Sequence, residues 1–428
     1  MAVPPATSAL FTDRYELTML GSALRDGSAG RQCVFEVFAR RLPDGRRYGV
    51  VAGTGRVLEA IRDFTFDADT LEFLRTNEIV DEECVDYLAG YRFRGDVVGY
   101  AEGELYFPYS PVLTVSASFA EAVVLETVVL SILNHDCAIA SAAARMVSAA
   151  GERPIIEMGS RRTHEQAAVA AARAAYLAGF ASTSNLAAAR HYGVPTAGTA
   201  AHAFTLLHDD EQDAFRAQLA TMGSDTTLLV DTYDIARGIE HAVAVAGPDL
   251  GAVRIDSGDL GVMARHAREQ LDGLGATKTQ IVVSGDLDEF AIAALAAAPV
   301  DAYGVGTSVV TGSGEPTANM VYKLVEVDGR PVSKRSEHKQ SQGGRKTALR
   351  AHRASGTAVE EIVVAGEAPR PGPGERLLQV PLITAGEPVV EVDGLAHARE
   401  RLRAAAVTLP WDGLKLSRGE AAIPTRLG

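Results

Sequence analysis

The sequence has little of what marks disulfide-rich, zinc-binding or nucleic-acid-binding proteins. Its 428 residues include three cysteines, Cys33, Cys84 and Cys137, which lie far apart without a C-x-x-C spacing. This distribution supports neither a disulfide framework nor a zinc site and favours a reducing compartment. Lys and Arg number 41 against 55 Asp and Glu, a formal net charge of -14. A general surface for nucleic acid or anionic membranes is therefore not expected, and any anionic ligand must be held by a local cluster of cations.

The sequence predicts neither a signal peptide nor a membrane-spanning helix. The N-terminus has no basic stretch ahead of an apolar one, so a signal peptide is not indicated. The most apolar long stretch, residues 117–133, is interrupted by Glu121 and Glu126, which indicates a buried helix rather than a membrane span. With 47% hydrophobic and 22% charged residues, we expect a cytoplasmic globular protein with ample material for a core.

Common nucleotide-binding signatures are lacking as well. No glycine-rich segment ends in the Gly-Lys-Ser/Thr of a Walker A sequence, and no Rossmann glycine fingerprint opens the chain. A P-loop is therefore not expected.

From about residue 150 the sequence repeats a short β-branched run, a polar loop and an alanine-rich segment. This rhythm predicts strand-loop-helix units. The expected strands are residues 154–158, 194–197, 226–230, 252–255, 280–283 and 301–305. Each is followed by polar residues, and polar groups at the carboxyl ends of successive parallel strands indicate a β/α barrel with its active site at that end. A doubly wound open sheet is the alternative.

The rest of the chain does not follow the barrel period. Residues 1–115 are assigned to an N-terminal α/β domain and 116–325 to the barrel. Residues 326–428 form a C-terminal segment expected to pack back on the N-terminal domain. Where the barrel gives way to that tail, residues 320–327 followed by Asp328 and Gly329 predict a hairpin.

Two segments of the barrel region carry candidate cations and a nucleophile. In EMGSRRTHEQAA, Arg161 and Arg162 are expected in the first turn of a helix over 163–178, where an arginine and the helix end would favour a phosphate or carboxylate. A surface ion pair is the alternative. In GTAAHAF, His202 follows a predicted strand and Thr199, so its imidazole is a candidate nucleophile or base, unless it is simply structural.

The segment VRIDSGDL places Arg254, Asp256 and Asp259 near one strand end. The carboxylates could bind sugar hydroxyls or Mg²⁺ beside a polyphosphate, and the arginine could meet an anionic group. The alternative is an Asp/Ser/Gly turn with capping carboxylates. That alternative does not explain an arginine inside the strand.

Two glycine loops and one basic loop are candidates for phosphate contacts. SGDLDE contains Gly285, and YGVGTSVVT contains Gly306 and Thr307; loops of this kind expose backbone N–H groups in the last barrel units, where phosphate sites often lie. The loop KRSEHKQSQGGRK, with Lys334, Lys339 and Lys346, is the candidate for polyphosphate contact from outside the barrel, unless it is an ordinary solvated loop.

Taken together, these segments resemble nicotinate phosphoribosyltransferases over most of the chain. The resemblance also includes TDRYELTML, FEVFARRLP, GFASTSN and VYKL, in the order in which they occur in that family. It implies a type II phosphoribosyltransferase: an incomplete or irregular β/α barrel plus an α/β domain built from both chain ends. The implied enzyme is an ATP-dependent ligase of NAD biosynthesis. It converts nicotinate, phosphoribosyl pyrophosphate, ATP and water to nicotinate mononucleotide, pyrophosphate, ADP and phosphate, with Mg²⁺ as cofactor.

The resemblance also implies roles for single residues. His202 would be the transiently phosphorylated histidine, so the protein would be a phosphoprotein. Arg254 and Thr199 would contact nicotinate, Tyr15 from a neighbouring subunit and Phe180 would stack on its ring, and Thr307 would contact phosphoribosyl pyrophosphate. Arg161, Gly285 and Gly306 are assigned to phosphate, and Asp256 and Asp259 to the ribose hydroxyls and Mg²⁺. A cross-subunit role for Tyr15 implies a homodimer with shared active sites.

Three other functions stay open. A nicotinamide or quinolinate phosphoribosyltransferase is the close alternative, and quinolinate would need further cations for its second carboxylate. A barrel aldolase or isomerase acting on a sugar phosphate could use the same phosphate loops, but no expected strand end carries a Schiff-base lysine. A non-catalytic binding protein is disfavoured by the number of polar groups at the strand ends.

Overall fold

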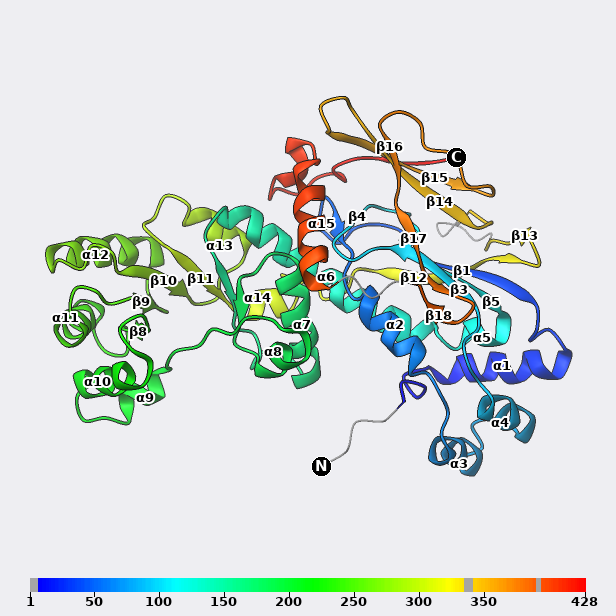
Figure 1. Ribbon diagram of the computed structural model, residues 1–428, viewed down its shortest axis with the longest axis horizontal. Coiled ribbons are helices and arrows are strands. Elements are labelled where there is room, and N and C mark those ends of the chain that lie inside the picture. The colour runs from blue at the N-terminus through cyan, green and yellow to red at the C-terminus, as the bar shows by residue number, and fades with distance from the viewer. Residues whose placement is uncertain (1–6, 335–341, 390–393) are drawn as a thin grey trace. The chain divides into compact units, whose positions relative to one another are not determined.

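A computed structural model describes residues 7–334, 342–389 and 394–428, and these form two compact units (Figure 1). Unit 1 comprises residues 1–141 and 315–428, and unit 2 comprises residues 142–314. The boundaries therefore differ from those expected at 115/116 and 325/326. The observed boundary between residues 141 and 142 lies inside one long helix, α6 (Glu126–Ala150). This helix begins in unit 1 and ends in unit 2.

Unit 1 is built on a seven-stranded sheet to which both ends of the chain contribute. Its strand order is β13-β12-β1-β5-β3-β17-β18. The strands are β1 (Gln32–Ala39), β3 (Asp96–Tyr100), β5 (Leu113–Ser118), β12 (Met320–Val327), β13 (Arg330–Pro331), β17 (Gln379–Thr384) and β18 (Glu387–Pro388). β12 pairs antiparallel with β1, and β17 pairs antiparallel with β3. The expected hairpin at β12–β13 is confirmed, and its turn residues Asp328 and Gly329 both have positive φ, as a two-residue turn of this kind requires.

Helices complete unit 1 around a large apolar core. They are α1 (Arg14–Asp26), α2 (Thr54–Arg62), α3 (Ala68–Thr76), α4 (Glu82–Ala89), α5 (Phe119–Val123), the start of α6, α15 (Leu395–Val407) and the 3-10 helix η1 (Trp411–Leu414). The core includes Phe35 of β1 stacked on Tyr322 of β12, with ring centroids 4.8 Å apart. Strands distant in sequence are thus joined by side-chain packing as well as by backbone hydrogen bonds.

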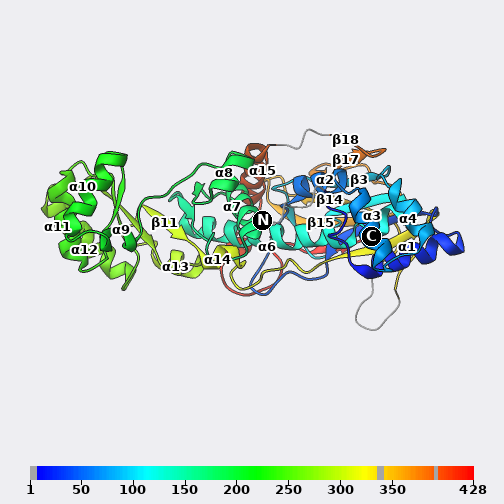
Figure 2. The same cartoon turned by 90° about the horizontal axis from the view of Figure 1, so that it is seen from below.

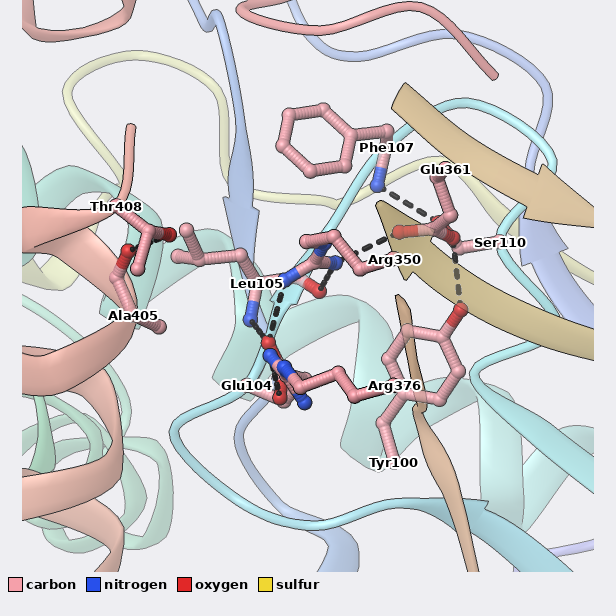
Figure 3. Close-up of polar contacts among 10 residues, drawn as sticks. All are labelled: Tyr100, Glu104, Leu105, Phe107, Ser110, Arg350, Glu361, Arg376, Ala405 and Thr408. Atoms are coloured by element: carbon pink, nitrogen blue, oxygen red, sulfur yellow. Dashed lines mark hydrogen bonds and ion pairs between the residues drawn. The ribbon is translucent and has the colours of Figure 1, made fainter. Parts of the chain in front are cut away.

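A second, four-stranded sheet of unit 1 carries a buried row of charges (Figure 3). It is formed by β14 (Lys346–His352), β15 (Ala358–Ala365), β16 (Glu375–Leu377) and β19 (Thr425–Leu427). Arg350 of β14 lies opposite Glu361 on one side and Arg376 on the other. Arg350 Nη1 donates to Glu104 Oε1 at 2.6 Å, and Arg376 Nη2 lies 2.7 Å from Glu104 Oε2. Glu104 therefore bridges two arginines that face each other across the strands, and Glu361, 2.7 Å from Arg350, supplies the second negative charge.

Glu104 also links this sheet to the remaining ribbon of unit 1. The ribbon consists of β2 (Gly49–Val50) and β4 (Leu105–Tyr106), which pair antiparallel. Glu104 directly precedes β4, and Arg350 Nη2 donates to the carbonyl of Leu105 at 2.8 Å. The charged row thereby fixes C-terminal strands against an N-terminal ribbon.

Unit 2 contains a six-stranded parallel sheet with the order β7-β6-β11-β10-β9-β8. The strands are β6 (Ile155–Glu157), β7 (Ser182–Thr183), β8 (Thr227–Leu229), β9 (Ala252–Ile255), β10 (Gln280–Ser284) and β11 (Ala302–Val305). An incomplete β/α barrel is confirmed as the fold class. Five of the six expected strands are present. Residues 194–197 do not form a strand and contribute only an isolated bridge between Thr196 and Thr183. Thr183 belongs to β7, which the sequence pattern did not predict.

Helices connect these strands in the expected alternation. They are α7 (Glu165–Leu177), α8 (Leu186–Tyr192), α9 (His202–Leu206), α10 (Glu211–Met222), α11 (Ile235–Ala246), α12 (Leu260–Gly273), α13 (Glu289–Ala294) and α14 (Thr307–Val310). α11 packs between α10 and α12, as Figures 1 and 2 show. Asp234 and Asp259 cap α11 and α12 by accepting from backbone N–H groups, so the end of each strand leads directly into a capped helix.

One helix among the described residues has the length and hydropathy of a membrane span by composition alone. This helix is α6, and 67% of its most apolar window is buried inside the protein. Such burial is typical of a core helix. The apolar stretch 117–133, expected as one buried helix, is divided between the end of β5, α5 and the start of α6. Cys33, Cys84 and Cys137 are buried free thiols.

Candidate active site

The carboxyl ends of β8, β9 and β10 bring together most of the expected catalytic residues. In parallel sheets this edge is where loops gather functional groups. His202, Arg254 and Asp256 are joined there by two residues that were not assigned a role from the sequence, Asp231 and Ser284. Asp231 directly follows the expected strand 226–230, and Ser284 directly follows the expected strand 280–283.

His202 is the first residue of α9, and its imidazole faces the loop that follows β8. Nδ1 lies 3.1 Å from the Thr232 hydroxyl oxygen, and Nε2 lies 4.0 Å from Asp231 Oδ1. The His202 side chain keeps 42% of its surface exposed. It is therefore oriented by two neighbours while remaining open to a ligand.

Asp231 is held rigidly behind this histidine. Only 1% of its side chain is exposed. Its Oδ2 accepts from the backbone N–H of Asp256 at 2.8 Å and from the Ser257 hydroxyl at 2.7 Å. Its Oδ1 is buried and has no hydrogen-bond partner among the residues that the structure describes. A buried carboxylate oxygen without a donor is costly, so the imidazole N–H is the natural group to satisfy it.

Arg254 lies inside β9 and is fixed by two side chains at the strand ends. Its Nε donates to the Ser284 hydroxyl oxygen at 2.9 Å, and its Nη2 donates to Asp256 Oδ1 at 3.3 Å. The Ser284 hydroxyl also hydrogen bonds Asp256 Oδ1. Within the described ranges no group accepts from Nη1, and 14% of the side chain is exposed. The guanidinium is thus held in place with donors left for a ligand carboxylate.

Asp256 and Asp259 differ in their surroundings. Asp256 is 29% exposed and uses one carboxylate oxygen for Arg254 and Ser284. Asp259 is the N-cap of α12, where Oδ1 accepts from the N–H of Val262 at 3.1 Å. Both supply the oxygen donors that Mg²⁺ prefers. No cluster of three or more His, Cys, Asp or Glu side chains suited to a metal occurs in the part of the chain that the structure describes.

The two glycine loops follow β10 and β11 as expected. Gly285 has φ of 113°, and a Cβ there would lie 2.7 Å from the carbonyl oxygen of Asp256. Only glycine lets this loop approach the neighbouring strand end so closely. Gly306 precedes α14, whose first residue, Thr307, is exposed. These loops therefore border the same edge as Arg254 and Asp256.

The end of β6 shows one correction. Arg161 and Arg162 are exposed in a turn, not in the first turn of a helix, because α7 begins at Glu165 with His164 as its N-cap. The side chain that organises this strand end is Glu157, which is buried and accepts from the Gly159 N–H and the Thr183 hydroxyl. Burial raises the pKa of Glu157, although these two hydrogen bonds lower it in part.

The residues expected to contact nicotinate lie in different environments. Thr199 is exposed just before α9. Phe180 has no exposed surface, so stacking on a ring would require its side chain to become accessible. Tyr15 belongs to unit 1 and is 47% exposed. Partial burial, together with Glu126 and Glu16, raises the pKa of the Tyr15 hydroxyl to about 12.

The basic loop needs a second correction. Lys346 is not a loop residue but the first residue of β14, where it is buried and its Nζ donates to Glu36 Oε2 at 2.8 Å. The interpretation of Lys346 as a polyphosphate contact is therefore wrong, because its ammonium is already neutralised in the core of unit 1. Lys334 is exposed, and Lys339 lies outside the described residues.

Comparison with known proteins identifies the family. Residues 10–134 match the model of the nicotinate phosphoribosyltransferase N-terminal domain, and residues 139–313 match that of the quinolinate phosphoribosyl transferase C-terminal domain. Over 426 residues the chain is 67% identical to the curated nicotinate phosphoribosyltransferase pncB1 of Mycobacterium tuberculosis, covering 97% of this chain and 94% of that protein. The chain belongs to the nicotinate phosphoribosyltransferase family.

Other nicotinate phosphoribosyltransferases show the same relationship. The Bacillus subtilis protein is 38% identical over 334 residues, covering 76% of this chain and 68% of that protein. The crystal structure of human nicotinic acid phosphoribosyltransferase superposes with a TM-score of 0.83 at 26% identity, covering 97% of each chain. Nicotinate-nucleotide pyrophosphorylase from Pyrococcus furiosus gives a TM-score of 0.80 at 26% identity, covering 95% of this chain and 97% of that one. The fold of this chain is therefore shared with these two solved structures.

Proposed function

We propose that this protein is an ATP-coupled nicotinate phosphoribosyltransferase of NAD salvage, with the strand-end cluster of unit 2 as its active site. The observation that carries the proposal is the position of the accessible imidazole of His202 beside Asp231 Oδ1, a buried oxygen that accepts no hydrogen bond from the residues that the structure describes. The family relationship supplies the substrates. We place the enzyme in the cytoplasm.

In the coupling step, Asp231 favours the tautomer of His202 that carries its proton on Nε2, because a carboxylate attracts an N–H. This leaves on Nδ1 the lone pair that accepts from the Thr232 hydroxyl; once that hydroxyl turns away, Nδ1 attacks the γ-phosphorus of ATP. A phosphorus–nitrogen bond forms and ADP departs. Asp231 then balances the positive charge of the phosphorylated ring, and water later attacks phosphorus to release phosphate and restore His202.

In the bond-forming step, the pyridine nitrogen of nicotinate attacks the ribose carbon as pyrophosphate leaves. Arg254, held by Ser284 and Asp256, binds the nicotinate carboxylate and keeps the ring nitrogen in line with the breaking bond. Gly285 and Thr307 border the phosphates. Mg²⁺, carried with the phosphates near Asp256 and Asp259, would offset the charge of the leaving group.

We propose further that the enzyme is a homodimer with shared active sites. Tyr15 does not fill the core of unit 1, since 47% of its surface is exposed, and Met19, four residues further along α1, is exposed at 36%. Residues four apart lie on one helix face. This exposed face of α1 suits the strand-end site of a partner subunit, where Tyr15 would stack on the pyridine ring.

A second candidate substrate is quinolinate, because the model matched by residues 139–313 is named for quinolinate phosphoribosyl transferase. The test is product formation from nicotinate, nicotinamide and quinolinate, each with phosphoribosyl pyrophosphate and with or without ATP. We expect nicotinate mononucleotide from nicotinate, with ATP raising the yield. Equal use of nicotinamide, or preference for quinolinate with release of carbon dioxide, would contradict the proposal.

A further inference from the structure

Unit 1 has a second cluster of cations that the active site in unit 2 does not include. A cavity of about 320 Å³ lies where the end of β1 and the turn after it meet a loop near the C-terminus. We call it the basic pocket; its lining consists of residues 40–46, Pro108 and residues 418–421. We propose that the basic pocket binds a phosphate-bearing anion and that the C-terminal loop completes it by supplying Arg418.

The charges of the lining favour an anion. Four arginines, Arg40, Arg41, Arg46 and Arg418, are opposed by two carboxylates, Asp44 and Glu420, in a chain whose net charge is -14. In the described ranges of the chain, no carboxylate forms an ion pair with Arg40, Arg41 or Arg418. The Nε of Arg40 is buried without a hydrogen-bond partner among those same residues. Clustered positive charges repel one another, and a bound anion removes this repulsion. A guanidinium group can donate two parallel hydrogen bonds to two oxygens of one phosphate.

One wall of the basic pocket is a rigid turn. The N–H of Arg46 donates to the carbonyl of Pro43 at 3.0 Å, and Gly45 adopts the positive φ of 77° that this turn needs. Only 6% of Arg46 is exposed. Arg46 is therefore fixed in the wall, while Arg40 and Arg41 extend from the end of β1.

The opposite wall is held in place by Arg47. Its guanidinium donates to the carbonyls of Ser417 at 3.2 Å, Arg418 at 3.1 Å and Glu420 at 3.4 Å. Its own carbonyl accepts from the N–H of Ala422 at 2.6 Å. One side chain thus holds three backbone carbonyls around Arg418. Arg47 is a positioning residue, because it acts through the loop and not through a ligand.

Gly419 shows how close this grip is. A Cβ at residue 419 would lie 2.3 Å from Nη2 of Arg47. A methyl group there would push the guanidinium away while leaving every charge of the basic pocket unchanged. Replacing Gly419 with alanine therefore separates the geometry of the loop from its charge.

The ligand class follows from the donors. Several guanidinium groups around one small cavity suit a group with many oxygens, such as a diphosphate or triphosphate, better than a single carboxylate. The phosphates could belong to a substrate of the proposed reaction or to a separate phosphate ligand. The proposal of an anion pocket does not depend on which of these supplies them.

The experiment measures hydrogen exchange of the full-length protein with and without inorganic pyrophosphate. We expect pyrophosphate to slow exchange in peptides covering residues 40–47 and 415–422. In Arg418→Gln and Gly419→Ala the concentration needed for half of this protection should rise at least about fivefold, because a charge-assisted contact is lost or displaced. Arg370→Gln removes one exposed positive charge outside the pocket and should leave the protection unchanged.

The outcomes separate this inference from the proposed function. Protection at the strand ends of unit 2 without protection of residues 40–47 and 415–422 overturns the anion pocket and leaves the catalytic proposal intact. Equal effects of Arg418→Gln and Arg370→Gln also overturn it, since only net charge would then matter. If Arg418→Gln raises the KM for ATP or phosphoribosyl pyrophosphate, the phosphates are those of a substrate. If pyrophosphate binding weakens while both KM values stay fixed, the pocket serves a separate phosphate ligand.

Discussion

Nε2 of His202 lies 4.0 Å from Oδ1 of Asp231, an oxygen that is buried and accepts no hydrogen bond from any described residue. The other oxygen of the same carboxylate is held by Asp256 and Ser257 of the neighbouring strand end. The imidazole is therefore aligned by a group that the next βα unit holds in place. This arrangement connects the loop after β9 to the reactivity of His202.

Asp231→Asn should lower phosphorylation of His202 by about 10- to 100-fold, the usual cost of losing a partner that orients a functional histidine. An amide cannot balance the charge of the phosphorylated ring, although it can still accept from Asp256 and Ser257. The measurement is labelled phosphate transferred from ATP to the protein. Synthesis of nicotinate mononucleotide without ATP should change much less, and an equal loss in both assays would contradict an orienting role.

His202→Ala should abolish acid-labile, base-stable labelling of the protein by ATP. The reason is that His202 is the imidazole placed beside the strand-end carboxylates, at 42% exposure. A slower ATP-independent reaction should survive, because the proposal assigns the histidine to the coupling of ATP hydrolysis and not to formation of the glycosidic bond. Label that persists in this variant would assign the phosphorylation to another residue.

Arg254→Gln should weaken nicotinate binding by about 1.5–3 kcal/mol, the range for a hydrogen bond to a charged group. Arg254 is pinned by Ser284 and Asp256, so its remaining donors are already oriented and their loss is not repaired by a side-chain shift. The KM for nicotinate is compared with that for nicotinamide in the wild type and the variant. If both substrates lose affinity equally, the residue does not recognise the carboxylate.

Subunits carrying Tyr15→Ala and subunits carrying His202→Ala should each be inactive in ATP-driven synthesis but regain activity when mixed. Random pairing creates heterodimers in which one of the two shared sites has both wild-type residues. Subunit exchange is verified with differently tagged chains. A mixture that exchanges subunits but stays inactive would show that Tyr15 does not serve a partner's site.

Arg350→Met should lower the free energy of unfolding by about 3–5 kcal/mol, because it leaves the buried Glu361 without a cation and Glu104 with the half-exposed Arg376 alone. Arg350 is 1% exposed and contacts both Glu104 and Glu361 (Figure 3). Arg426→Met, which breaks the exposed pair with Glu360, is the matched control and should cost at most about 1 kcal/mol. Denaturant unfolding of both variants gives the two free energies. Similar losses would show that the buried charges stabilise the fold no more than an exposed ion pair does.

The same row should make unfolding sensitive to acid. Burial opposes the ionisation of Glu104, but Arg350 and Arg376 outweigh it and hold the pKa of this carboxyl below its ordinary 4.5. A carboxyl whose pKa is lowered by folding adds stability above its ordinary pKa, and that stability is lost as the pH falls through the folded value. Unfolding free energies measured below about pH 4.5 should therefore fall less steeply in Glu104→Gln than in the wild type. Parallel slopes would rule out this contribution.

Much of unit 2 was decided locally by the sequence. β-branched runs such as residues 252–255 and 280–283 became parallel strands, since short length, β-branched residues and flanking turn residues together favour a strand over a helix. Polar residues at successive strand ends then had to meet at one edge. His202, Arg254 and Asp256 could be placed together from the sequence for that reason. Asp231 could not be singled out, because donors from the next strand end bury it and hold its Oδ2. Its Oδ1 is thereby left without a donor among the described residues.

Only the tertiary structure decided the rest. Lys346 looks like one more cation in a basic loop, yet the pairing of β14 brings it to Glu36, 310 residues away, where burial makes an ion pair obligatory. Arg161 lies outside the helix expected to contain it, because His164 is the N-cap and the helix begins at Glu165. Arg47 and Gly419 meet only because the C-terminal loop returns to the turn after β1. Local propensity and periodicity act over a few residues, so they determined the strands and their polar ends, while contacts between distant segments determined which charges are neutralised and which stay available to a ligand.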